Sequence, residues 1–149
     1  MTEIKDLEKC TYFPLDCDSL IAIGWLSIET RYQKGPVEKN FYNKLFEYAK
    51  DPWEPVASAG IHNCELCQFN PPGFYRNIFI PYKGKIYISP EGIVHYIAAH
   101  WYQPPAVFVD AVLECPEMRS MALQTMNLKE LVKCQIWQYP RHIMMAAIC

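Results

Sequence analysis

The sequence predicts an α+β fold, with a small, mostly antiparallel sheet in the first 90 residues and a helical C-terminal part. Three observations support this prediction. Short apolar runs bounded by turn residues recur before residue 90, and one pair of them flanks a glycine-containing turn. Apolar residues recur at helical spacing in one early segment and again after residue 90. The length of 149 residues suits one domain, so we assign residues 1–149 to a single domain.

The early elements are predicted from runs of apolar residues. Residues 20–26 form a short continuous apolar run, whose isoleucines and tryptophan favour a buried strand over a helix. Residues 10–13 are a candidate for a shorter strand. Residues 36–49 form an amphipathic helix with Pro36 at its first position, and residues 56–62 are again strand-like.

The middle of the chain predicts a β-hairpin followed by a helix. Residues 78–80 and 86–88 flank a turn in which Gly84 supplies the positive φ that a tight turn needs. Ser89 as N-cap and Pro90 at the first helical position predict that the helix begins directly after the hairpin. The buried face of this helix is expected to carry Ile93, Val94, Ile97 and Trp101.

Two further helices are predicted in the C-terminal part. One covers residues 105–113 and ends before Pro116. The other begins at Asn127, because Asn127 and Glu130 resemble a capping box. Its buried stripe is predicted to contain Leu128, Leu131, Val132 and Ile136. Residues 139–149 are too apolar for a free linker and are expected to pack against the domain.

Composition and charge narrow the functional classes. The chain is 51% hydrophobic, with a net charge of −2 and a sequence pI of about 6.1, so it lacks the signature of disorder and the basic footprint of nucleic-acid binding. No apolar run reaches the roughly 18 residues of a membrane helix, and residues 1–6 do not resemble a secretory signal. Seven cysteines, an odd number, favour a reducing compartment in which most serve as small buried hydrophobes. We expect a soluble cytoplasmic protein without nucleic-acid or membrane partners.

The segment His62-x-Cys64-x-x-Cys67, with His95 and His100 further along the chain, has the pattern of a metal site. A C-x-x-C turn brings two thiolates to one point, and zinc then needs two more ligands, commonly imidazoles from another element. Because side chains alternate along an extended segment, His62 and Cys64 project to the same face. The spacing therefore predicts zinc as the cofactor, with its ligands among these five residues.

The two later histidines are predicted to lie on one helix. A separation of five residues corresponds to about 140° beyond a full helical turn. We therefore expect only one of His95 and His100 to reach a shared ion. The neighbouring aromatic residues Tyr96, Trp101 and Tyr102 are expected to pack in the core and around its rim rather than to line a ligand pocket.

Two alternatives to structural zinc stay open: a buried polar cluster without metal, and a redox-active cysteine pair. The redox alternative is the weaker one, because no helix is predicted to begin at the C-x-x-C turn. The zinc-deaminase signature, the H-E-x-x-H motif, phosphate-binding glycine loops and the G-x-S-x-G motif are all absent from the sequence.

These motifs resemble those of an uncharacterised bacterial domain family with the pattern G-W-L, then G-x-H-x-C-x-x-C, then H-Y-x-x-x-H-x-Y-x-P-P. The matching strings begin at Gly24, Gly60 and His95, and the resemblance covers roughly residues 20–113. The resemblance implies that one site contains His62, Cys64, Cys67, His95 and His100. It implies no activity, because the family has none established.

Two functional classes follow from these observations. We favour a protein-binding module stabilised by the zinc site, with toxin-immunity proteins as an analogous class, because these are also small, mildly acidic and free of catalytic motifs. The expected partner is then a protein, such as a toxin. The alternative is a zinc-dependent hydrolase or nuclease in which Cys64, Cys67 and one histidine hold the ion and another histidine acts as base. No carboxylate near the cluster has an obvious acid–base role, so we assign no catalytic residue.

Overall fold

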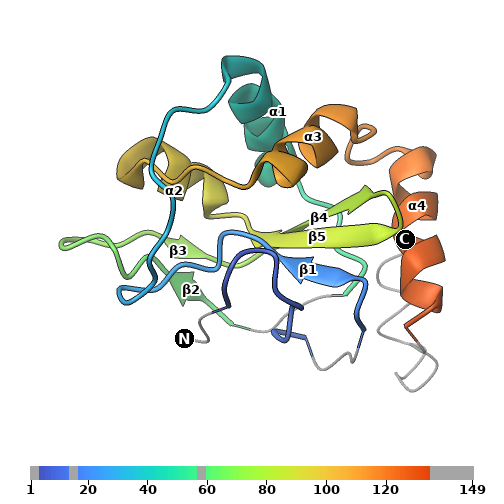
Figure 1. Cartoon of the computed structure of the whole chain (residues 1–149), viewed down its shortest axis with the longest axis horizontal. Coiled ribbons are helices and arrows are strands. Elements are labelled where there is room, and N and C mark those ends of the chain that lie inside the picture. The colour runs from blue at the N-terminus through green and yellow to red at the C-terminus, as the bar shows by residue number, and fades with distance from the viewer. Residues whose placement is uncertain (1–3, 14–16, 57–59, 135–149) are drawn as a thin grey trace.

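The computed structural model describes residues 4–13, 17–56 and 60–134, and it confirms the α+β fold class. In chain order the elements are β1 (Leu20–Ala22), α1 (Lys39–Lys50), β2 (His62–Asn63), β3 (Gly73–Phe74), β4 (Asn77–Tyr82), β5 (Lys85–Pro90), α2 (Ile93–His100), α3 (Ala106–Glu114) and α4 (Met121–Val132). A mixed sheet has the order β1-β5-β4, with β1 parallel and β4 antiparallel to β5, and β2 and β3 form a separate antiparallel ribbon. Figure 1 shows the ribbon and α2 at one end of the molecule and α4 at the other.

The larger sheet separates two apolar clusters. Along β4, Ile78 and Ile80 belong to the cluster that α1, α2 and α3 also line, whereas Phe79 belongs to the cluster that contains the N-terminal segment and Leu131 of α4. This alternation follows from the two-residue period of a strand. Because both faces of the sheet are covered, β4 and β5 are apolar along almost their whole length.

The predicted hairpin is confirmed. β4 and β5 are joined by Lys83 and Gly84, whose φ values of 46° and 79° are both positive. Two such residues in succession form the type I′ turn that matches the twist of the flanking strands. The amphipathic helix predicted at residues 36–49 is also present, as α1.

α2 begins later than predicted. Ser89 and Pro90 are the last residues of β5 and pair with β4, so the strand ladder uses the residues that were expected to start the helix. At the other end of α2, Trp101 is 64% exposed and has a left-handed φ of 57°. Trp101 therefore does not belong to the buried face, because the helix has ended at His100.

α3 lies close to its predicted bounds, whereas α4 begins earlier than predicted. Ser120 is the N-cap of α4, and its side chain accepts a hydrogen bond from the Leu123 amide. Asn127 lies inside the helix, where it is fully buried and donates to the Phe79 carbonyl at 3.4 Å. The helix therefore begins after Ser120, seven residues before Asn127. The predicted capping box of Asn127 and Glu130 is wrong, because both residues lie within the helix. Ile136 and residues 139–149 lie outside the described residues.

Three of the predicted strands are shorter than expected or absent, and β1 covers only Leu20–Ala22 of the predicted residues 20–26. Residues 10–13 form no strand. The chain before them meets β1 at an isolated bridge between Lys9 and Ile21, and the Leu7 amide also donates to the Ala22 carbonyl at 2.9 Å. Of residues 56–62, the structure places only His62 in a strand, and residues 57–59 lie outside the described part.

One pair of cysteines is oxidised, whereas the sequence predicted reduced cysteines. Cys17 and Cys134 form a disulfide that connects the segment before β1 with the chain after α4. Cys10 and Cys115 are free and buried, as expected for small apolar side chains. Disulfides persist mainly in oxidising compartments, so this pair runs against the expectation of unpaired cysteines. Within the part of the chain that the structure describes, no helix has both the length and the apolarity to cross a bilayer.

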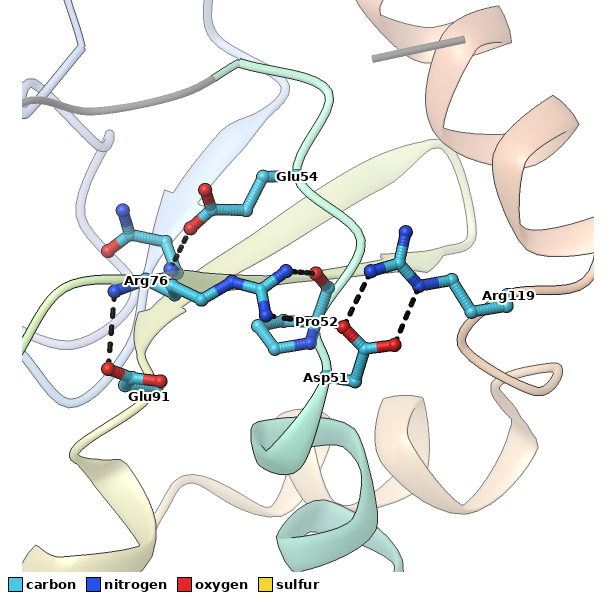
Figure 2. A network of polar contacts seen from close by, with 7 residues as sticks. Asp51, Pro52, Glu54, Arg76, Glu91 and Arg119 are labelled. Atoms are coloured by element: carbon cyan, nitrogen blue, oxygen red, sulfur yellow. Dashed lines mark hydrogen bonds and ion pairs between the residues drawn. The ribbon is translucent and has the colours of Figure 1, made fainter. Parts of the chain in front are cut away.

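A polar network fixes the start of α2 relative to the ribbon and α1 (Figure 2). Glu91 accepts hydrogen bonds from the backbone amides of Tyr75 and Arg76, at 2.8 and 3.3 Å, directly after β3. The Arg76 guanidinium binds Asp51 at the end of α1, and Asp51 also binds Arg119 at 2.6 Å. The Glu91 carboxylate thus holds the chain after β3 against the start of α2.

Gly92 lets the ribbon approach α2 closely. A Cβ atom at this position would overlap the ring of Phe74 in β3. The absence of a side chain at Gly92 therefore allows the ribbon to pack directly against the start of the helix.

Gly92→Ala is expected to lower the free energy of unfolding by about 1–3 kcal/mol, the usual cost of overpacking, because the Phe74 ring must move away from α2. Urea denaturation followed by circular dichroism measures the change. Gly84→Ala is the comparison, since a Cβ there meets no atom within 4 Å and only the positive φ opposes it, at a cost of about 1 kcal/mol. A Gly92→Ala variant as stable as wild type would contradict the close packing.

Candidate metal centre

The C-x-x-C turn follows β2 directly and is closed at its base by backbone hydrogen bonding. The Cys64 amide donates to the Pro72 carbonyl at 3.0 Å. The amides of Leu66 and Cys67 donate to the Cys64 sulfur, which stabilises a thiolate at this atom. Cys64 is buried and Cys67 is half-buried. The turn thus holds one sulfur inside the protein and the other at its edge.

Both histidines of the centre come from α2. The His95 ring contacts Phe74 of the ribbon, with ring centroids 5.8 Å apart. His100 is the last residue of the helix, and its carbonyl accepts a hydrogen bond from the Tyr32 hydroxyl at 3.1 Å. The two imidazole rings are 5.1 Å apart, so the helix presents them as a pair.

Two sulfur and two nitrogen atoms converge where the ribbon meets α2. Cys67 Sγ lies 3.3 Å from His95 Nε2 and 3.4 Å from His100 Nε2, and Cys64 Sγ lies 3.5 Å from His100 Nε2. All four ligand atoms lie within 4.8 Å of one another. Zinc–sulfur and zinc–nitrogen bonds of about 2.3 and 2.0 Å at tetrahedral angles give a sulfur–nitrogen separation of about 3.5 Å. The four residues are therefore close enough to bind one metal ion, and the donor set matches that of structural zinc sites.

Both His95 and His100 reach this point, contrary to the expectation from ideal helix geometry. The amides of Trp101 and Tyr102 both donate to the Tyr96 carbonyl, so the last turn of α2 is wider than an α-helical turn. The chain thus leaves the α-helical path directly after His100, and the two imidazoles, with ring centroids 5.1 Å apart, both approach Cys67 from the end of the helix.

His62, the fifth predicted ligand, lies beside the group of four and not within it. Its Nε2 atom is 3.0 Å from the Tyr96 hydroxyl, and its ring contacts the Trp25 ring, with centroids 5.9 Å apart. Burial lowers the pKa of His62, so its imidazole is neutral at neutral pH. In this arrangement His62 supports Tyr96, which is the chain neighbour of the ligand candidate His95.

Burial sets the protonation states of the candidate ligands. Burial raises the pKa of the Cys64 thiol, and the neighbouring Cys67 adds to that rise. Burial lowers the pKa of His95, and His100 lowers it further. A metal ion needs a neutral imidazole and a deprotonated thiol. Metal binding here therefore releases protons chiefly from the cysteines.

Three residues that sequence patterns did not indicate also support the centre. Phe74 packs on His95, and Tyr32 binds the His100 carbonyl. The Glu65 carboxylate accepts a hydrogen bond from the Ile28 amide at 3.1 Å, which ties the C-x-x-C turn to the long loop before α1. Each of these contacts joins segments that are far apart in the sequence, so no periodicity or spacing marks them.

Comparison with known proteins identifies a family. Residues 2–113 match the family described as "Domain of unknown function (DUF7919)", and this region contains all four candidate ligands. Because the match covers most of the chain, the chain belongs to this family. The expectation of an uncharacterised domain family is thereby confirmed. No match was found among curated proteins or among solved structures.

Cys64→Ser is expected to abolish the stabilisation that a bound metal gives. Because a site that forms only on folding converts metal affinity into folding free energy, the variant should be several kcal/mol less stable than the metal-loaded wild type. Thermal unfolding with and without EDTA measures this effect: the Tm of the wild type should fall when EDTA is added, and that of Cys64→Ser should not change. Cys115→Ser, at another buried free cysteine, should respond to EDTA as the wild type does. Equal melting temperatures for Cys64→Ser and wild type would contradict metal binding.

Zinc affinity is expected to rise between about pH 6 and pH 8. The Cys64 thiol, whose pKa is raised, keeps its proton at neutral pH, and this proton competes with the metal for the sulfur. The competition weakens as the pH rises, so the apparent affinity increases. Competition with a chromophoric chelator at a series of pH values tests this. An affinity that does not change with pH would show that the cysteines do not coordinate the metal.

Proposed function

We propose that this member of the family binds one zinc ion through Cys64, Cys67, His95 and His100, and that the resulting closed centre is structural. The convergence of these four ligand atoms within 4.8 Å carries the proposal. Two thiolates and two imidazoles complete a tetrahedral shell, which is the arrangement of zinc sites that stabilise a fold. A catalytic zinc instead keeps a position open for water.

The groups around the candidate ligands also support a structural role. No carboxylate belongs to the group of potential ligands among residues 4–13, 17–56 and 60–134. Glu65, the carboxylate closest in sequence, is engaged by the Ile28 amide, and His62 is engaged by Tyr96. Neither Glu65 nor His62 is therefore free to act as the base that would activate a metal-bound water.

The ribbon explains why this fold would need a metal. β2 and β3 contain two residues each, and an isolated pair of such strands is not stable in water. An ion shared by the C-x-x-C turn and α2 would cross-link the ribbon to the helix layer. The free energy of metal binding would then stabilise the fold directly.

We further propose that the protein acts by binding a protein partner through surface outside the four ligands. The support is the small size, the mild acidity, the lack of a catalytic motif, and large apolar side chains exposed around the centre. Ile28, Phe69 and Trp101 are 72%, 82% and 64% exposed, and each adjoins a segment that forms the centre. Neutralisation of a toxin is the specific form of this role that the sequence profile favours.

Metal analysis and spectroscopy test the proposed centre. Native mass spectrometry of protein purified without chelator is expected to give one zinc per chain. The cobalt-substituted protein is expected to show tetrahedral d–d absorption and thiolate charge-transfer bands, and X-ray absorption of the zinc form should give two sulfur and two nitrogen neighbours. Protein with no bound metal would overturn the proposal. Three protein ligands and one water would support the hydrolase or nuclease instead.

A further inference from the structure

A hollow of about 480 Å³ lies directly beside the candidate metal centre. It is lined by Tyr32, Lys34, Gly35, Ala99, His100 and Trp101. Its walls come from the long loop before α1 and from the end of α2. His100 thus belongs both to the group of candidate ligands and to the lining of the hollow.

Trp101 is an unfavourable residue for its position in the fold. Its φ of 57° is in the left-handed region, where a bulky side chain is strained and where helices commonly place glycine. The backbone is held there from two sides, since the Trp101 amide donates to Tyr96 and its carbonyl accepts from the Gly35 amide at 3.0 Å. The indole gains little burial in return, because Trp101 is 64% exposed. A strained, exposed aromatic residue beside a hollow points to a role in binding.

The charge of the hollow is one-sided. Lys34 is the only lysine, arginine, aspartate or glutamate among the described residues that line it. The Lys34 ammonium lies over the Tyr32 ring, 5.4 Å from the ring centroid, which places the charge against an aromatic wall. The hollow therefore combines a cation with two aromatic surfaces and presents no carboxylate.

Tyr32 also lines a larger hollow of about 750 Å³, whose charges do not select a ligand. Lys5 and Arg31 line it together with Glu38 and Asp110, so charges of both signs are present. Only the smaller hollow combines one sign of charge with the strained tryptophan among the described residues that line the two.

We propose that the hollow at Lys34 and Trp101 binds an acidic segment of the partner protein, with a carboxylate side chain against the Lys34 ammonium and a neighbouring apolar side chain against the Trp101 indole. This inference rests on the proposed function as a protein-binding module. Phe69, which is 82% exposed and follows Cys67 by two residues, is a second exposed aromatic side chain in a segment that forms the centre.

Nuclear magnetic resonance with short capped peptides tests the proposal. The chain has four tryptophans, and the indole N–H resonance of Trp101 is identified by its loss in Trp101→Gly. A hexapeptide of alternating glutamate and phenylalanine should shift this resonance saturably, with a dissociation constant of about 1 mM or tighter. The same peptide with lysine for glutamate, or with serine for phenylalanine, should bind at least about tenfold more weakly.

The matched variants locate the binding to the hollow. Lys34→Gln should weaken binding of the acidic peptide severalfold, and Trp101→Gly should abolish it. Lys83→Gln is the control, because the Lys83 ammonium also lies over a tyrosine ring, that of Tyr82, but away from this hollow. Trp101→Gly should unfold at or above the wild-type Tm, since glycine adopts the left-handed conformation without strain.

The zinc content of every sample separates the two proposals. If each variant carries one zinc per chain and the Trp101 resonance does not shift, or shifts equally with the lysine peptide, the docking inference fails while the metal centre stands. A lower Tm for Trp101→Gly would also count against it, because the tryptophan would then serve the fold. Wild-type protein without zinc would overturn the proposed metal centre, whereas binding of the acidic peptide to that same sample would still support the hollow as a docking site.

Discussion

The junction between the β2–β3 ribbon and α2 is the constraint on which the rest of the candidate site depends. The ribbon has too few residues to hold its own shape, so its geometry is set by what holds it to the helix. Phe74 packs where Gly92 leaves space, and Glu91 holds the backbone that follows β3. Two sulfurs then meet two imidazoles at the same junction. Apolar contacts, polar contacts and the four candidate metal ligands are therefore all found at one small interface.

α2 takes its own position from the larger sheet. It follows β5 after a short connection, and Ile93, Tyr96 and Ile97 are buried in the cluster that α1 and α3 share. Tyr96 links the two regions, because its ring is in this core while its hydroxyl contacts His62 of the ribbon. Ligand side chains that are held by a packed helix need little reordering when an ion binds. The sheet thus positions α2, and α2 in turn positions the ribbon and the four candidate ligands.

The Cys and His pattern contained the four residues that converge among its five candidates, although it predicted that only one of His95 and His100 would reach a shared ion. Local signals in the sequence were sufficient for the hairpin and for α1, because both depend on neighbours along the chain. They failed where two segments compete for the same residues or where distant segments meet. Ser89 has the chemistry of an N-cap, yet pairing with β4 keeps it in β5. His95 and His100 both approach Cys67, a contact between distant segments that helical spacing alone does not predict. The pairing of Cys17 with Cys134 could not have been read from spacing, since seven cysteines allow many pairings.

The disulfide and α4 extend the packed fold beyond the region that matches the family. The family match ends at residue 113, but Leu123 and Leu131 of α4 fill the two apolar clusters, and Cys134 ties the chain beyond α4 to Cys17. A fragment cut at the end of the matched region would keep every candidate ligand and lose a buried leucine from each of the two apolar clusters. The region that matches the family is therefore shorter than the region that completes the packing of the fold.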